Sequence, residues 1–513
     1  MIVKNLNFGD EARDQVFKGI EKLTNAVSST LGASGKCVIL EDAQGNPMIT
    51  KDGVTVADSI TLLNPVENIG ARLIKEAARK TVKEAGDGTT TATILAHSIL
   101  KEAYAKLNKK NGRIIKEGIL SAVDKVIDYL NNTSVPVDEK IKEIATISTN
   151  NDSELGSLIA DAFMAVGKTG VVIMEPSSLG ETKIEIVEGV EYDKGLLNQN
   201  FITNKENSTC ELEKPLVLIV DSKIDSIRQI QGVLEHVIKA NKALLIIGQV
   251  EAPVLSALVM NKIKGNIKIN VIDPPAFGLR RKEILEDLSL LTSAQIINED
   301  LGDDLNTIQI DYLGECLKAT TNNDQTIIQV SEINNEVEKI ISNIKEKLTT
   351  KLKPHQVIGY EQRLARLSAK VAIVKVGANS DIELKEKQDR VEDAICATKA
   401  AIKEGIVAGG GIALLNAATS INEENIGEEI LLKSILYPFK VILENAGIVP
   451  NVPQKEGYGI NVVTGNMVHM ISEGIIDPLL VTKSALTNAA SVATTILSTD
   501  CVINNIRVDE SSR

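Results

Sequence analysis

The sequence predicts a multidomain α+β/α/β protein in which two mainly helical ends flank an α/β middle. Its length of 513 residues suggests roughly three domains, at about 150 residues each. Ala- and Thr-rich helical stretches occupy both ends of the chain. Short apolar runs alternate with helical segments in the middle, as in a sheet that is layered with helices. We therefore expect one domain to be built from both chain ends, with the middle inserted between its halves.

The N-terminal block is expected to be mainly helical. Residues 10–31 are predicted to form an amphipathic helix, because apolar residues recur there at helical spacing. These residues are Val16, Ile20, Leu23 and Val27. Residues 37–40 and 47–57 are typical of strands around a turn, with Asp52 and Gly53 at its tip. Further helices are expected at residues 65–84, 89–108 and 112–131.

The middle of the chain is expected to hold the layered sheet. A helical pair after a break at residues 133–136 leads into it. The predicted strands lie at residues 169–176, 182–192, 214–222, 242–250 and 267–275. Helices are expected between and after them, at residues 226–240, 251–264, 333–348 and 354–370.

The last part of the chain is expected to return from a strand to helices. The strand is predicted at residues 370–378. The helices are predicted at residues 384–403, 405–419, 430–446 and 481–499. The acidic segment at residues 421–429 is expected to be an exposed loop.

Composition argues against several classes of protein. The chain carries 56 Lys and Arg against 69 Asp and Glu, a formal charge of −13, so a nucleic-acid-binding surface over the whole protein is not expected. Aromatic residues make up 3% and Trp is absent, which argues against stacking platforms for bases. The sequence has neither a long uninterrupted apolar run nor a signal-peptide pattern, so we expect no membrane span. Five widely spaced cysteines favour reduced, mostly buried thiols.

The sharpest local feature is the segment Gly-Asp-Gly-Thr-Thr-Thr-Ala-Thr at residues 86–93. Glycines let a backbone approach a ligand closely, and a following helix offers unpaired N–H groups to an anion. The threonines add hydroxyl donors for phosphate oxygens, and Asp87 is suited to bind Mg²⁺ together with such oxygens. The alternative is an ordinary glycine turn in which Asp or Thr caps the helix.

Three other features also have a purely structural explanation. Residues 30–36 (TLGASGK) fail the P-loop pattern in spacing, and Cys37 stands where Ser or Thr is required, so a glycine cap at a helix end is simpler. Residues 408–411 (Ala-Gly-Gly-Gly) fit a close approach to a ligand, a helix break or close packing. Asp52 and Asp393 stand out by position, yet each alone suits a turn or a solvated helix face.

Taken together, these segments resemble the group I chaperonins, the GroEL-type 60-kDa heat-shock proteins, over essentially the whole chain. AGDGTTTAT (85–93) and RVEDAICATKAAIKEGIVAGGG (390–411) in one chain are highly specific. The resemblance is also carried by TLGASGK (30–36), ITKDGVTVA (49–57), VEGVEYDKG (187–195), PAFGLRRKEILED (275–287), YGIN (458–461) and IIDP (475–478). The group II chaperonins share the Gly-Asp-Gly-Thr-Thr element but carry a built-in helical lid, for which the middle region shows no insertion.

The resemblance implies a GroEL-like chaperonin fold with three domains. These are a mainly helical equatorial ATP-binding domain (1–132 and 404–513), a small intermediate hinge domain (133–188 and 371–403) and an α/β apical domain (189–370). It implies an ATPase that binds non-native polypeptides in a ring cavity and promotes their folding through ATP-driven cycling. The implied partners are unfolded clients, a GroES-type co-chaperonin lid and identical subunits in seven-membered rings, in the cytoplasm, with neither nucleic acid nor membrane.

Carried over position by position, the resemblance implies a site for ATP, Mg²⁺ and K⁺. Asp393 would orient or activate the attacking water, with Asp52 assisting, and Asp87 would bind Mg²⁺. The K⁺ ion would lie near Thr30, Lys51 and Thr90. The implied nucleotide contacts are Thr30, Leu31, Gly32, Lys51, Asp87, Gly88, Thr89, Thr90, Thr91, Gly410, Asn461 and Asp477, of which the last three would contact the adenosine.

The resemblance also implies a client-binding groove with exposed apolar side chains, which mark binding surfaces. Its implied positions are Leu196, Asn198, Asn200, Phe201, Gln231, Leu234, Leu255, Val259 and Met260. Asn200 and Gln231 replace residues that are usually apolar, Lys370 follows Ala369 where the family has two glycines, and the usual Gly-Gly-Met tail is missing. These departures motivate an alternative function, a chaperonin-like holdase or scaffold with a weakened ATP cycle.

Overall fold

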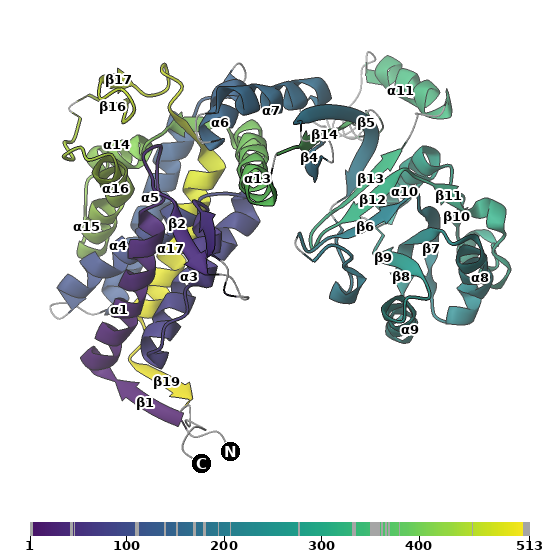
Figure 1. The fold of residues 1–513 in the computed structure, drawn as a ribbon, viewed down its shortest axis with the longest axis horizontal. Coiled ribbons are helices and arrows are strands. Elements are labelled where there is room, and N and C mark those ends of the chain that lie inside the picture. Colours follow the sequence, from purple (N-terminus) through teal and green to yellow (C-terminus); the bar gives the residue numbers. More distant parts are fainter. Residues whose placement is uncertain are drawn as a thin grey trace. The chain divides into compact units, whose positions relative to one another are not determined.

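A computed structural model gives the fold as two compact units, each of which is described by itself (Figure 1). The helical unit comprises residues 1–160, 176–182 and 376–513, and the sheet unit comprises residues 161–175 and 183–375. The structure describes residues 4–505 except for 42–44, 46, 108–111, 138–139, 150–151, 168–170, 178–180, 193, 206, 275–277, 331–334, 349–359, 361–362, 365–366, 368–369, 379 and 454. The prediction that one unit is built from both chain ends is confirmed. The finer division into three domains stays a prediction.

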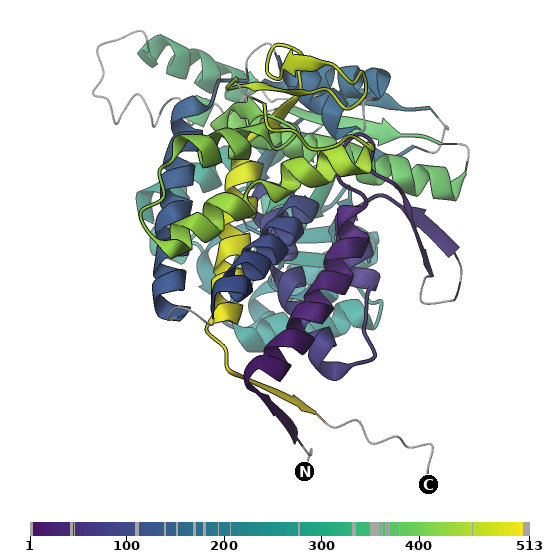
Figure 2. The ribbon, with the colours of Figure 1, turned by 90° about the vertical axis from the view of Figure 1, so that its left-hand side faces the viewer.

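Long helices from both chain ends form the core of the helical unit. They are α1 (Gly9–Ser28), α3 (Pro65–Ala85), α4 (Thr89–Leu107), α5 (Gly112–Thr133) and α17 (Leu479–Leu497). The C-terminal α17 packs against α3, α4 and α5, and in Figure 2 it runs in yellow among the purple and blue helices of the N-terminal end. Its small residues Ala485, Ala489 and Ala493 are fully buried, so neighbouring helices approach it closely.

Shorter elements complete the helical unit. The helices are α2 (Gly53–Ser59), α6 (Ile141–Ser148), α13 (Asp381–Glu404), α14 (Ile412–Ser420), α15 (Ile426–Ser434) and α16 (Tyr437–Asn445). Helix α7 (Ser153–Val166) begins in this unit and ends in the sheet unit. Two antiparallel strand pairs join distant segments: β1 (Lys4–Phe8) with β19 (Cys501–Asn505), and β15 (Ile406–Ala408) with β18 (Ile476–Pro478). Two others join neighbouring segments: β2 (Val38–Glu41) with β3 (Pro47–Thr50), and β16 (Tyr458–Ile460) with β17 (Met467–His469).

Two sheets and their covering helices form the sheet unit. Strands β7 (Leu216–Ile224), β8 (Ala243–Val250) and β9 (Lys268–Ile272) are parallel, with β10 (Ile296–Ile297) and β11 (Gly314–Glu315) added to β7. The second sheet has the order β4 (Val171–Pro176), β14 (Lys370–Val376), β5 (Lys183–Tyr192), β13 (Thr326–Val330), β12 (Lys318–Thr321) and β6 (Cys210–Glu213). The helices are α8 (Gln231–Ala240), α9 (Ala252–Ile263), α10 (Gly278–Thr292) and α11 (Asn335–Leu348), with 3₁₀ turns η2 (Gln199–Phe201), η3 (Ile227–Ile230), η4 (Glu299–Leu301), η5 (Leu305–Thr307) and η6 (Ile310–Tyr312). The predicted alternation of strands and helices is therefore confirmed.

The predicted strand at residues 47–57 is wrong in its second half. It ends at Thr50, and α2 begins at Gly53. The Asp52 carboxylate accepts hydrogen bonds from the backbone N–H groups of Val54 (3.1 Å) and Thr55 (2.7 Å), so it caps the helix. This cap outweighs the strand preference of the β-branched residues that follow it.

The C-terminal region differs from its prediction in three places. Residues 406–408 form a strand, and the helix expected from residue 405 begins only at Ile412. The helix expected at 430–446 is two helices, α15 and α16. The acidic segment is exposed only at its start, because Glu428 is buried in the first turn of α15 and forms a 3.0 Å ion pair with Lys125.

Some predicted features lie outside the described residues. Of the helix expected at 354–370, only Tyr360, Arg363, Leu364, Leu367 and Lys370 are described. Ala369 and the C-terminal residues 506–513 also lie outside. Lys370 itself opens β14 and pairs in register with Glu188.

All five cysteines are free, and burial varies among them. Cys210 and Cys316 are buried, Cys396 and Cys501 are partly buried, and Cys37 is exposed. Burial raises the pKa of Cys210, Cys316 and Cys396 to about 12, so these thiols stay protonated. Among the described helices, none is both long and apolar enough to cross a membrane.

His97 in α4 makes the stability of the helical unit sensitive to acid. Its ring stacks on Phe17 at 5.3 Å, and burial lowers its pKa to about 4. A depressed folded-state pKa means that the unfolded chain takes up the proton first, so stability falls as the pH drops below about 6.5. Between pH 7.5 and pH 5 we expect the parent to lose about 2 kcal/mol more than His97→Leu. Urea unfolding of both proteins at the two pH values measures this, and equal losses would contradict it.

Candidate functional site

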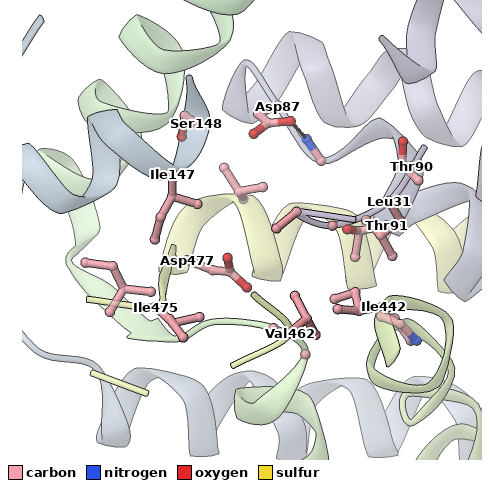
Figure 3. A pocket seen from close by; sticks show the side chains of 18 of the residues that line it. Leu31, Asp87, Thr90, Thr91, Ile147, Ser148, Ile442, Val462, Ile475 and Asp477 are labelled. Carbon is pink, nitrogen blue, oxygen red and sulfur yellow. Dashed lines mark hydrogen bonds between the residues drawn. The ribbon is translucent and has the colours of Figure 1, made fainter. Parts of the chain in front are cut away.

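A cavity of about 910 Å³ lies within the helical unit (Figure 3). Its size is in the range of small-molecule sites. Every residue for which the sequence implied a nucleotide or catalytic role lines it. These are Thr30, Leu31, Gly32, Lys51, Asp52, Asp87, Gly88, Thr89, Thr90, Thr91, Asp393, Gly410, Asn461 and Asp477. The structure thus brings together residues from seven separate stretches of the sequence.

The loop after α1 forms one wall of the cavity. Thr30 Oγ1 donates to the Val27 carbonyl (2.8 Å) and lies 3.5 Å from Thr90 Oγ1. Gly32 has a φ of +85°, which favours glycine, and Lys51 Nζ donates to its carbonyl (3.2 Å). This carbonyl and the two hydroxyls provide oxygen atoms of the type that K⁺ prefers.

The segment before α4 is shaped by two glycines around Asp87. Gly86 ends α3 with a φ of +75°, and Gly88 has a φ of +94°. A Cβ on Gly88 would lie 2.8 Å from Val481, so no larger residue fits there without a shift. Asp87 is partly buried at this turn, and the Gly88 N–H donates to its carboxylate.

The N-terminus of α4 is suited to hold phosphate groups. Its first residues, Thr89, Thr90 and Thr91, line the cavity, and the first N–H groups of a helix lack partners within it. Gly53 lets the next loop approach this turn, since a Cβ there would lie 2.3 Å from Thr90 Oγ1. Backbone donors, hydroxyls and the positive end of the helix dipole therefore converge on one place.

The acidic residues of the cavity repel one another. Burial raises the pKa of Asp393 well above its usual range, and the charges of Asp87 and Asp52 add to this. Burial also raises the pKa of Asp87, an effect that the Gly88 N–H opposes and that Asp52 increases. A bound cation would relieve this repulsion.

The carboxylates fit Mg²⁺ only together with a ligand. Within the described part of the chain, no group of three or more acidic, His or Cys side chains is arranged to hold a metal. Mg²⁺ usually binds through one or two carboxylates plus phosphate oxygens and water. Asp87 beside the phosphate-binding turn matches that arrangement.

The glycine run at 409–411 serves close backbone packing as well as the site. A Cβ on Gly409 would lie 2.9 Å from the Ile476 nitrogen, and one on Gly411 would lie 2.7 Å from the Phe439 nitrogen. Gly410, with a φ of +65°, lines the cavity between them. Of the explanations open from the sequence, close packing is therefore shown, and approach to a ligand is compatible with it.

Asp477 and Asn461 also line the cavity. Asp477 lies on β18, paired with Val407, and burial raises its pKa to about 7, with a contribution from Asp87. Asn461 Oδ1 accepts hydrogen bonds from the N–H groups of Val463 (3.0 Å) and Thr464 (3.3 Å), which shapes the loop after β16.

Sequence reasoning missed the apolar wall and the residues from α6. Figure 3 shows Ile147 and Ser148 from α6, together with Ile442, Val462 and Ile475, around the same space as Asp477. Phe439, Leu443, Ile460 and Met470 also line it. These residues come from unconnected segments. Ile460 and Ile475 lie in the motifs YGIN (458–461) and IIDP (475–478), but no role was expected for them, and only the fold reveals that they line the cavity. On α13, helical spacing from Asp393 would have indicated Glu386, Asp389 and Arg390, which also line the cavity.

The implied client-binding positions lie in the sheet unit, and two of them are not exposed. Phe201 is fully buried and Val259 is 6% exposed, because both pack into the core of this unit, so the prediction of their exposure is wrong. Leu196, Asn198, Leu234 and Leu255 are partly buried, and Asn200, Gln231 and Met260 are exposed. Lys262 Nζ donates to the carbonyls of Asn200 (2.6 Å) and Ile202 (2.7 Å), which ties α9 to η2.

Comparison with known proteins gives one consistent family. The model of the TCP-1/cpn60 chaperonin family matches residues 23–507. The chain is similar in structure to the chaperonin gp146 from the bacteriophage EL 2 (Pseudomonas aeruginosa), crystallised in presence of ATP-BeFx. For crystal form II the TM-score is 0.75 at 22% identity, and for crystal form I it is 0.67 at 21% identity. Both matches cover 98% of this chain and 99% of gp146.

Proposed function

The chain belongs to the TCP-1/cpn60 chaperonin family, and from this premise we propose that it is a GroEL-type chaperone that hydrolyses ATP to promote the folding of non-native polypeptides. The observation that carries the proposal is one cavity that joins a helix start suited to phosphate, the acidic residues of α13 and an apolar wall. The ATP analogue present with gp146 supports a nucleotide as the ligand.

Different side chains of the cavity would bind different parts of the nucleotide. The N–H and hydroxyl groups of Thr89, Thr90 and Thr91 would hold the phosphates, and the apolar wall would hold the base. Asp477, with Asn461 and Gly410, would contact the adenosine. Asp393 would orient the attacking water and accept its proton, because its raised pKa makes it the stronger base.

Besides assisting Asp393, Asp52 would also have a structural role. Its carboxylate caps α2 and also accepts a 2.6 Å hydrogen bond from Thr55 Oγ1, which fixes it at the edge of the site. Mg²⁺ held by Asp87 and phosphate oxygens would neutralise negative charge on the phosphates. We also propose K⁺ beside Thr30, Lys51 and Thr90, where two hydroxyls lie 3.5 Å apart.

The remaining parts of the proposal concern partners and assembly. We propose seven-membered rings, a GroES-type lid, cytoplasmic action and the three-domain division given by the resemblance. The client surface would consist of the accessible positions Leu196, Asn198, Asn200, Gln231, Leu234, Leu255 and Met260. Ile238 on α8 and Ile263 on α9, both more than half exposed, would add the apolar area that Phe201 and Val259 do not provide.

A second candidate function is a holdase or scaffold with a weakened ATP cycle. The specific observation in its favour is the polar character of the client surface, where Asn200 and Gln231 are exposed and Phe201 is not. All three acids of the nucleotide site, Asp52, Asp87 and Asp393, are nevertheless present in the cavity. We therefore favour the active chaperone.

One pair of assays separates the two functions. A denatured enzyme that does not refold alone is diluted into the full-length protein, and enzyme recovery and ATP consumption are measured together. We expect recovery to require ATP and to stop with a non-hydrolysable analogue. Capture of the client without ATP-dependent release would favour the scaffold, and absence of both capture and ATP consumption would contradict the proposed function.

A further inference from the structure

Arg390 is a positively charged residue on the wall of the cavity that α13 forms. The described residues of this helix that line the cavity are Glu386, Asp389, Arg390 and Asp393, and their spacing places them on one helix face. Arg390 precedes Asp393 by three residues on that face, and its side chain is 28% exposed, so part of it is accessible. None of the roles assigned above uses this side chain.

An ion pair on the same helix holds the guanidinium but uses only part of it. Arg390 Nη2 donates to Glu386 Oε2, one helical turn earlier. A guanidinium carries several N–H donors in a planar fork, so one carboxylate oxygen leaves donors for a second acceptor. The pair therefore orients Arg390 without using up its capacity to bind an anion.

The guanidinium lies near the amine of Lys51, which belongs to another wall of the cavity. Burial lowers the pKa of Lys51, and the positive charge of Arg390 acts in the same direction. Burial likewise raises the pKa of Asp389 and Asp393, and the charge of Asp52, next to Lys51, adds to this. The charged face of α13 is therefore close to the loop after β3 that carries Lys51 and Asp52.

An anion between these two walls would relieve the repulsion between Arg390 and Lys51. The loop of Lys51 also approaches the helix start suited to phosphate, because a Cβ on Gly53 would lie 2.3 Å from Thr90 Oγ1. The planar fork of a guanidinium matches the oxygens of a phosphate group. If Asp393 orients the attacking water, the phosphate that this water attacks lies beside the same face of α13, within reach of Arg390.

We propose that Arg390 is a further catalytic residue, which binds the terminal phosphate of ATP and stabilises the charge on this group as it is transferred to water. The inference rests on the proposed function, since it needs ATP in the cavity. In this step the water oxygen bonds to the terminal phosphorus, the bond to the bridging oxygen breaks, and ADP leaves with that electron pair. The water gives its proton to Asp393, and Arg390 keeps all of its protons. An arginine supplied by the same chain has this role in other nucleotide hydrolases.

Three measurements on the full-length protein with Mg²⁺ test the proposal. They are single-turnover hydrolysis of ATP and calorimetric titration with ADP and with a non-hydrolysable ATP analogue. The variants are Arg390→Gln and Arg390→Lys, which keeps the charge but loses the fork. The matched control is Lys387→Gln, which breaks an ion pair with Glu383 (3.3 Å) on the same helix outside the cavity. Thermal unfolding of each variant verifies that it is folded.

We expect Arg390→Gln to slow single-turnover hydrolysis about a hundredfold and to weaken the ATP analogue about tenfold, with ADP affinity unchanged. A contact to the terminal phosphate affects only the ligand that has this phosphate, whereas a structural role would affect both ligands. Arg390→Lys should lie between the parent and Arg390→Gln, and Lys387→Gln should equal the parent in all three measurements.

Two results would overturn the inference while leaving the proposed function intact. They are a parental rate of hydrolysis in Arg390→Gln, and equal weakening of ADP and the analogue in this variant when folded. If Arg390→Gln does not fold, the same two criteria apply to Arg390→Lys. Failure of the parent itself to bind the analogue and to hydrolyse ATP would instead overturn the proposed function.

Discussion

Replacement of Asp393 by Ala is expected to lower ATP turnover by a factor of about a hundred or more, while ATP still binds. The loss follows from removal of the group that accepts the proton of the attacking water, since a positioned general base contributes roughly 10²–10⁴ in rate. Binding should be equal to the parent or tighter, because the substitution removes a partly buried carboxylate that Asp87 and Asp52 repel. Single-turnover hydrolysis and equilibrium binding of ATP, measured on the same preparation, separate the two effects.

Two further variants test whether the loss of turnover is specific to the Asp393 carboxylate. Asp393→Asn keeps the size of the side chain but cannot act as a base, so it should be as inactive as Asp393→Ala. Glu404→Gln, at the end of the same helix, breaks an ion pair with Lys483 outside the cavity and should leave turnover unchanged. Parental turnover in either Asp393 variant would remove this residue from the proposed mechanism.

The long helices could be predicted from the sequence because their periodic apolar faces are the faces that the fold buries. Val16, Ile20, Leu23 and Val27 of α1 are all buried, as their spacing indicates. The glycine turn before α4 could be predicted as well, because its glycines have the backbone angles that the motif suggests, +75° at Gly86. In both cases the structure is determined by residues that lie close together in the sequence.

The predictions from the sequence are wrong where distant contacts or local capping determine the structure. Asp52 looked like the tip of a hairpin, but its carboxylate caps a helix that the β-branched residues after it do not favour. Glu428 looked exposed in its acidic segment, but Lys125, some 300 residues away, pairs with it in the fold. Phe201 could not be recognised as buried, because its place depends on how the two sheets of its unit close around it.

The sequence did not indicate that these apolar residues line one side of the cavity. Ile147, Ile442, Val462 and Ile475 are ordinary aliphatic residues on separate elements, and each alone reads as core. They become a binding wall only because α6, α16 and the loops around β16 and β18 meet around one space. The acidic residues of the cavity can be found from sequence motifs, whereas its apolar wall can be found only from the fold.

Replacement of Asp87 by Asn is expected to change activity and stability in opposite directions. Turnover should fall about a thousandfold and Mg²⁺ should no longer tighten ATP binding, because the ligand that places the metal beside the phosphates is lost. Without nucleotide, however, the variant should be more stable than the parent by about 1 kcal/mol, because the Asp87 charge that raises the pKa of both Asp393 and Asp477 is gone.

The change in stability distinguishes a metal ligand that is repelled by neighbouring carboxylates from a residue that only stabilises the fold. Thermal unfolding in EDTA, with and without added Mg²⁺ and ATP, measures it. The control Asp58→Asn removes an exposed carboxylate that pairs with Arg79 at 2.8 Å outside the cavity, so it should be close to neutral in both assays. If Asp87→Asn were less stable than the parent and retained Mg²⁺-dependent turnover, the carboxylate would be a structural group, and the repulsion among the three acids would have to be balanced by a partner other than the metal.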